Sequence, residues 1–150
     1  MEYQAFLIKY AEIGTKGKNR YVFEDALAKD IRMKLKRATG EYYVARERGR
    51  IYVHVKSESY DYEECMDALQ HVFGIAGIAP MVQIPYSADF ADLEKAVLSY
   101  FRAAYGDKPV SFKVESRRAE KSYPMTSPEI EMELGHSILE NFPNPRVDVH

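Results

Sequence analysis

The sequence predicts an α+β protein made of two consecutive units, and three observations support this. Over residues 1–86, the hydrophobic pattern alternates between periods near two and near four, in the order strand, helix, strand, strand, helix, strand. That order is typical of a ferredoxin-like βαββαβ fold, in which the helices cover one face of an antiparallel sheet. From residue 87 to residue 150 the pattern restarts as helix, strand, helix, which predicts a partial α/β unit.

The first unit takes its predicted elements from the spacing of its apolar residues. In the first helix, one face carries Phe23, Leu27, Ile31 and Leu35, with Ala26 widening the stripe. Basic residues fill most of the remaining positions of this helix. The predicted elements are, in order, a strand at 4–10, a helix at about 20–37, a strand at 42–45, a strand at 51–55, a helix that starts after Asp61, and a strand at 78–84.

The turns of the first unit are marked by glycine and by acidic residues. A short glycine-bearing segment at 46–50 is typical of a hairpin connection between two strands. Acidic residues favour the first turn of the second helix, and Gly74 suits the position just beyond its last turn. We therefore expect the unit to end near Pro85.

The second unit is predicted to begin with a helix that Ser87 or Asp89 caps and that Gly106 ends. Apolar and polar residues then alternate over 110–115, which predicts a half-buried strand. A further helix is expected at about 127–141. The last residues start another strand, so we expect this unit to be incomplete at its C-terminal end, with an open strand edge through which two copies could pair.

The start of the last helix has two possible caps. Thr126 with Glu129 fits a capping box, whereas Ser127 followed by Pro128 fits an N-cap with proline in the first turn. Either start directs a helix N-terminus toward the preceding turn. Free N–H groups and the helix dipole at such a terminus favour anions.

The turn before this helix is basic. Arg117, Arg118 and Lys121 follow the predicted strand directly. Together with the helix N-terminus, these cations predict a corner that binds phosphate oxygens. A solvated strand end would have the same residues, so this pattern alone does not decide between the two interpretations.

The net charge of −2 conceals an uneven distribution. Residues 1–56 contain 13 Lys and Arg against 7 Asp and Glu, whereas residues 57–109 contain 3 against 9. A basic first third is the electrostatic footprint of nucleic-acid binding, although a solvated helix face would look similar. No apolar run is long enough to span a membrane and no secretory signal begins the chain, so a cytoplasmic location is expected.

The sequence offers few candidate residues for catalysis or for metal or nucleotide binding. Cys65 is the only cysteine and falls on the apolar face of a predicted helix, which indicates an inert thiol. The four histidines show no metal-binding spacing. Lys16-Gly17-Lys18 lacks the spacing of a nucleotide-binding loop and suits contact with an RNA backbone better. Three tyrosines of the hairpin could stack on bases, but a core or edge role is the favoured interpretation for Tyr42, Tyr43 and Tyr52.

Both halves of the sequence resemble one known family. The segments Val114–Ala119 and Lys121–Ile130, with Glu133-Leu134-Gly135 after them, resemble the THUMP module of the tRNA 4-thiouridine synthetases. Ile8–Arg20, with Phe23-Glu24, is similar to the opening of the same enzymes, where a ferredoxin-like domain precedes THUMP. The chain departs from that pattern at Ala11 and Gly14. The resemblance covers nearly the whole sequence and implies a ferredoxin-like domain at 1–86 and a THUMP domain at 87–150.

The resemblance also implies a function. THUMP is expected to hold the 3′ end of tRNA, and the ferredoxin-like domain to help place the acceptor stem. The family's catalytic part uses ATP with Mg and a sulfur-carrier protein, and it has a Ser-Gly-Gly-x-Asp-Ser loop that these 150 residues lack. We therefore expect no cofactor and no thiolation chemistry in this chain. The candidate RNA-binding residues are Lys16, Lys18, Asn19, Arg20, Lys113, Ser116, Arg117, Arg118, Lys121, Ser122, Tyr123, Thr126 and Ser127.

Two alternatives stay open at this point. The chain could be the RNA-recognition region of another THUMP-containing tRNA modifier, such as a methyltransferase. It could also be a ferredoxin-like interaction domain that does not bind RNA, in which the basic first third is only solvated surface.

Overall fold

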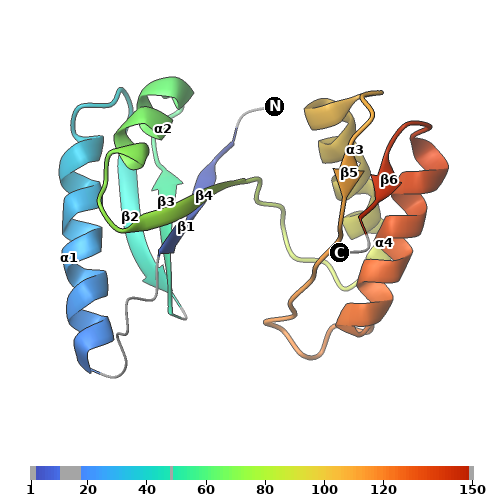
Figure 1. Cartoon of the computed structure of the whole chain (residues 1–150). Coiled ribbons are helices and arrows are strands. Elements are labelled where there is room, and N and C mark those ends of the chain that lie inside the picture. Colours follow the sequence, from blue (N-terminus) through green and yellow to red (C-terminus); the bar gives the residue numbers. More distant parts are fainter. Residues whose placement is uncertain (1–2, 11–17, 48, 149–150) are drawn as a thin grey trace. The chain divides into compact units, whose positions relative to one another are not determined.

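The computed structural model describes residues 3–10, 18–47 and 49–148. The chain divides into two compact units, Glu2–Gln83 and Ile84–His150. Each unit has its own helices, its own sheet and its own hydrophobic core (Figure 1).

The first unit has the predicted ferredoxin-like fold. Its sheet has the strand order β2-β3-β1-β4, and the neighbouring strands are antiparallel. Both described helices of this unit, α1 and α2, lie on one face of this sheet, so neither lies on the other face (Figure 1). The elements are β1 (Ala5–Tyr10), α1 (Lys18–Leu35), β2 (Tyr42–Glu47), β3 (Arg50–Val55), α2 (Tyr62–Gln70) and β4 (Ile75–Met81).

The core of the first unit lies between the helices and the sheet. Phe6, Ile31, Ile51 and Leu69 are completely buried there. Burial of a side chain of this size stabilises a fold by roughly 1.5–3 kcal/mol. The predicted face of α1 is confirmed except at its margin, where Ala28 is buried and Ala26 is exposed. Position 28 lies three residues before Ile31 and thus shares its face, whereas position 26 does not.

The end of α2 and the start of β4 differ from the prediction. The helix ends at Gln70 with His71 as its C-cap, so Gly74 does not occupy the position directly after the cap. Gly74 instead has φ 97° and turns the chain into β4. This strand begins at Ile75 and not at residue 78, because its pairing with β1 extends to Tyr10. Pro80 fits within it because β4 is an edge strand.

The hairpin is tighter than predicted. The pairing of β2 with β3 continues to Glu47 and Arg50, so the connection consists of residues 48–49. Gly49 has φ 75°, a conformation that glycine adopts without steric cost.

The second unit packs two helices against a short parallel pair of strands. Its elements are α3 (Phe90–Tyr105), β5 (Ser111–Phe112), α4 (Ser127–Asn141) and β6 (Arg146–Val147). Asp89, and not Ser87, caps α3 by accepting a hydrogen bond from the amide of Ala91. The core is centred on Phe101, with Ile138 and Phe142 packed around it.

The strand predicted over 110–115 is only partly formed. Its burial alternates along the whole segment as predicted, with Val110, Phe112 and Val114 half-buried against α3 and α4. Its strand pairing is limited to Ser111 and Phe112, because the neighbouring strand β6 is itself two residues long.

No helix among the described residues has the length and apolar character needed to cross a membrane.

Candidate functional site

The start of α4 is fixed by Thr126. Its Oγ1 accepts a hydrogen bond from the amide of Glu129 at 3.3 Å, and its own amide donates to Glu129 Oε1 at 3.1 Å. This reciprocal pair is a capping box, so Thr126 is the N-cap and Ser127 is the first helical residue. The hydrogen bond from the Thr126 backbone holds the pKa of Glu129 below its usual value.

The capping box changes the anion site expected at this helix terminus. Pro128 has no N–H group, and the amide of Glu129 already donates to Thr126. Among the first three helical residues, that leaves Ser127 with an amide that none of these bonds uses. The carboxylate of Glu129 also places a negative charge there. An anion bound at this corner would therefore depend on side-chain cations more than on the helix terminus.

The two adjacent arginines of the corner have different environments. Arg118 is half-buried, and its Nη1 donates to the carbonyl oxygens of Lys121 and Tyr123, at 3.3 and 3.2 Å. These two bonds hold together the turn between Arg118 and Tyr123. Arg117 is exposed. Its guanidinium is available to an external partner, which the sequence pattern alone could not distinguish.

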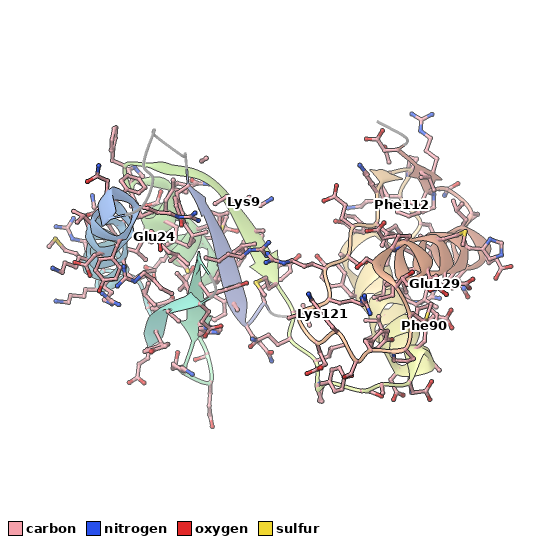
Figure 2. The ribbon with its side chains drawn as sticks, turned by 90° about the horizontal axis from the view of Figure 1, so that it is seen from below. Lys9, Glu24, Phe90, Phe112, Lys121 and Glu129 are labelled. Atoms are coloured by element: carbon pink, nitrogen blue, oxygen red, sulfur yellow. The ribbon has the colours of Figure 1, made fainter. Side chains whose placement is uncertain are left out.

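The lysines of the corner are exposed, whereas its serines make hydrogen bonds within the second unit. Lys121 lies in the turn before α4, as Figure 2 shows, and Lys113 forms an exposed ion pair with Glu115 at 3.5 Å. Ser116 donates from its amide to Glu131 Oε1 at 3.0 Å and from its hydroxyl to the carbonyl oxygen of Ser127. These bonds fasten the end of the strand segment to the first turns of α4. In the turn itself, the Ser122 hydroxyl donates to Glu120 at 2.8 Å.

A groove of about 1180 Å³ lies beside this corner, within the second unit. Its wall is largely apolar and comes from α3, from α4, from the segment that precedes α3 and from residues 114–123. Two buried polar atoms there have no hydrogen-bond partner, the Nε of Arg118 and the hydroxyl of Tyr123. Residues that line the groove include Tyr86, Leu93, Val97, Val114, Tyr123, Ile130, Lys95, Arg117 and Arg118.

Tyr86 and Lys95 are groove residues that the sequence prediction missed. The ring of Tyr86 lies edge-on to that of Tyr123, with 6.4 Å between their centroids. Tyr86 is also 65% exposed. Tyr86 lies in a connecting segment, where no periodicity identifies a face, and this explains why sequence patterns did not indicate it.

The second predicted group of site residues is placed only in part. Lys16 lies outside the described residues, Lys18 begins α1, and Asn19 is exposed. Arg20 donates from Nε to Glu24 Oε1 at 2.9 Å and from Nη2 to the carbonyl oxygen of Gly49 at 3.3 Å. The first bond lies within α1 and the second ties α1 to the β2–β3 hairpin, so Arg20 has a structural role. Because the two groups belong to different units, each is described separately.

Metal and thiol chemistry find no support among the described residues. These contain no cluster of three His, Cys, Asp or Glu side chains that could hold a metal ion. Cys65 is completely buried, and this burial raises its pKa to about 11. A thiol of this kind is a poor nucleophile at neutral pH.

Comparisons with known proteins agree with this division of the chain. The family model of the ThiI ferredoxin-like domain matches residues 5–79, and the THUMP domain model matches residues 87–150. The "Probable tRNA sulfurtransferase" of Lachnospira eligens is 53% identical over 148 residues, which are 99% of this chain and 37% of that protein. The protein of the same name from Agathobacter rectalis is 49% identical, with the same coverage.

Two solved structures are also similar. One is a 4-thiouridine synthetase in complex with RNA and with bound ATP, with a TM-score of 0.70, 31% identity, and coverage of 99% of this chain and 36% of that chain. The other is PH1313 from Pyrococcus horikoshii, with a TM-score of 0.74, 30% identity, and coverage of 97% and 47%. The chain thus spans less than half the length of these relatives. By its ferredoxin-like domain, followed by a THUMP domain, this chain belongs to the ThiI family.

Proposed function

We propose that this chain is the tRNA-binding region of a tRNA sulfurtransferase, and that its second unit holds the 3′ end and acceptor stem of the tRNA. The observation that carries the proposal is the groove in the THUMP domain, where apolar and aromatic walls meet the guanidinium groups of Arg117 and Arg118. The names of the similar proteins and the RNA in one similar structure support the choice of tRNA.

The groove suits unpaired nucleotides. Its apolar wall and the ring of Tyr86 can receive base rings, since unpaired bases stack on aromatic side chains. Exposed Arg117, Lys113 and Lys121 can bind the phosphates that position the strand.

The first unit can contribute charge to the same RNA. The surface of α1 and the residues after it carry a series of exposed cations, which suits non-specific contact with the phosphates of a double-stranded stem. These exposed residues include Arg32, Lys36 and Arg37.

The longer protein is part of this proposal. Residues outside this chain would bind ATP with Mg, receive sulfur from a sulfur-carrier protein and thiolate the uridine. The reaction would take place in the cytoplasm. Three expectations stay predictions: the pairing of two chains, the domain boundary at 86/87 and the incompleteness of the THUMP domain. The ThiI ferredoxin-like match favours a sulfurtransferase over a THUMP-containing methyltransferase.

The test compares intact tRNA with tRNA that lacks its 3′-terminal nucleotides, in filter-binding assays at two or more salt concentrations. Affinity should fall with salt, with log K decreasing by roughly 0.7 to 0.9 per phosphate contact. Intact tRNA should bind more tightly than trimmed tRNA. An affinity that does not change with salt concentration, or that is equal for the two tRNAs, would refute the proposal.

Single variants separate a site from a general charge effect. Arg117→Ala, Lys113→Ala and Lys121→Ala should each weaken tRNA binding. Lys29→Ala is the matched control, because it removes one exposed cation from α1, outside the THUMP domain. If Lys29→Ala costs as much affinity as Arg117→Ala, the corner is not a specific site.

A further inference from the structure

One face of the ferredoxin-like sheet, called the uncovered face because neither α1 nor α2 lies on it, carries a row of aromatic rings. Strand register places Tyr43 opposite His54, and Tyr52 two residues before His54 on the same face. The Tyr43 and His54 rings are stacked with centroids 6.4 Å apart, and the His54 and Tyr52 rings are stacked with centroids 6.1 Å apart. Tyr43 is 56% exposed. We call Tyr43, His54 and Tyr52 the aromatic row.

This row is not part of the hydrophobic core. Val44 and Val53, the strand neighbours of Tyr43, Tyr52 and His54, point to the opposite face and are buried under the helices. Tyr42 likewise packs against that core, which confirms the core role predicted for it. Tyr43 lies on β2, an edge strand of the sheet, in agreement with the expected edge role, and it projects from the uncovered face.

Cations and small residues surround the row. Lys56 Nζ lies 5.6 Å from the centroid of the Tyr43 ring. On β1, the stem of Lys9 lies over Gly77 of β4, and Lys9 is exposed (Figure 2). The small residues Ala45 and Ala79 lie on the same face, where Ala45 pairs with Tyr52. The carboxylate of Glu47 also lies beside the row, with its Oε1 4.0 Å from Nε2 of His54.

A polar hollow of about 350 Å³ adjoins the row at His54. Its walls offer amide, hydroxyl, imidazole and ammonium groups within hydrogen-bonding reach of a small polar molecule. The polar residues that line it include Gln4, His54, Lys56, Ser57, Glu58 and Gln83.

We propose that this sheet face is a second RNA-binding surface, which stacks unpaired nucleotides of single-stranded RNA on the aromatic row. The ring faces suit bases of any sequence, since every base has a π face. Lys56 and Lys9 suit the phosphates between successive bases, and the polar hollow suits the edge of one base or its ribose. Four-stranded sheets that present aromatic side chains in this way are a recurrent means of binding unpaired RNA. This inference does not depend on the corner at α4.

The experiment uses the full chain and an octamer of uridines with 2-aminopurine at one central position. Stacking quenches the fluorescence of 2-aminopurine, so quenching reports the contact directly. Tyr43→Ala should weaken binding by about 5- to 150-fold, the range observed when one stacking aromatic is removed. Tyr43→Phe keeps the ring and should retain the quenching. Lys56→Gln should reduce the salt slope of log K by about 0.7.

The matched control is Tyr21→Ala. Tyr21 is 65% exposed and also lies beside a cation, with the Arg46 guanidinium 4.4 Å from its ring centroid, but it is on α1 and not on the uncovered sheet face. The proposal is overturned if Tyr43→Ala binds like the wild type, if Tyr21→Ala causes the same loss, or if a fully paired RNA duplex competes as well as the single strand.

Discussion

Arg118 Nη1 donates a hydrogen bond to the carbonyl oxygen of Tyr123, 3.2 Å away and five residues further along the chain. A second bond from the same nitrogen reaches the carbonyl oxygen of Lys121. The adjacent Arg117 is exposed. Neighbouring residues of the same type therefore have different tasks, one holding the turn together and the other facing solvent.

Arg118→Ala should lower the free energy of unfolding of the THUMP domain by about 1–2 kcal/mol, since two carbonyl groups lose a charged donor. Arg117→Ala should change it by less than about 0.5 kcal/mol, as is usual for an exposed residue. Urea unfolding of both variants measures the difference. Equal losses in the two variants would contradict the structural role of Arg118.

Thr126→Ala should destabilise the THUMP domain by about 0.5–2 kcal/mol, because the amide of Glu129 loses its acceptor at the helix start. Thr126→Ser should restore most of this stability. Ser127→Ala is the control, because Ser127 is the first helical residue and contacts Ser116 through its backbone carbonyl. Thermal unfolding would contradict the assignment of the cap if Ser127→Ala were the more damaging change.

Cys65 should make the protein sensitive to alkali. Its pKa is about 11 in the folded protein and 9.0 for a free thiol, so the folded state holds the proton more tightly. The resulting stability is fully present below pH 9 and is lost as the pH rises toward 11. The loss is of the order of 2–3 kcal/mol, by the relation between pKa shift and free energy. In urea unfolding between pH 8 and pH 11, Cys65→Ala should show a smaller decline than the wild type. If the free energy of unfolding declined equally with pH in both proteins, the pKa of the thiol would not differ between the folded and unfolded states.

Gly40→Ala should destabilise the ferredoxin-like domain, by about 1–3 kcal/mol for an unfavourable backbone conformation. Gly40 has φ 119°, and a Cβ atom there would lie 2.7 Å from the Cβ of Tyr60. Gly135→Ala offers the opposite case, because it lies inside α4 with no atom within 4 Å of an added Cβ. That change should stabilise by about 0.5–1 kcal/mol through helix propensity. Calorimetry of both variants checks the pair, and two changes of the same sign would disagree with the structure.

The sequence by itself determined the order of the elements and the fold of the first unit. Period-four spacing in α1 and alternation in the strands depend only on the geometry of a helix and of a strand, so they can be read without knowledge of long-range contacts. The capping pattern of α4 is equally local, since Thr126 and Glu129 are three residues apart, although the sequence could not choose between Thr126 and Ser127.

Tertiary structure decided what each residue of the candidate sites does. Arg118 and Arg117 differ only because the turn brings two carbonyl groups to one of them, and Arg20 is tied to a hairpin 29 residues away. The start of β4 depended on its pairing with β1, because Gly77 and Pro80 interrupt its local strand pattern. The exposure of Tyr43 likewise depends on which face of the sheet the helices cover. Such relations follow from distant pairing and packing, which local periodicity does not encode.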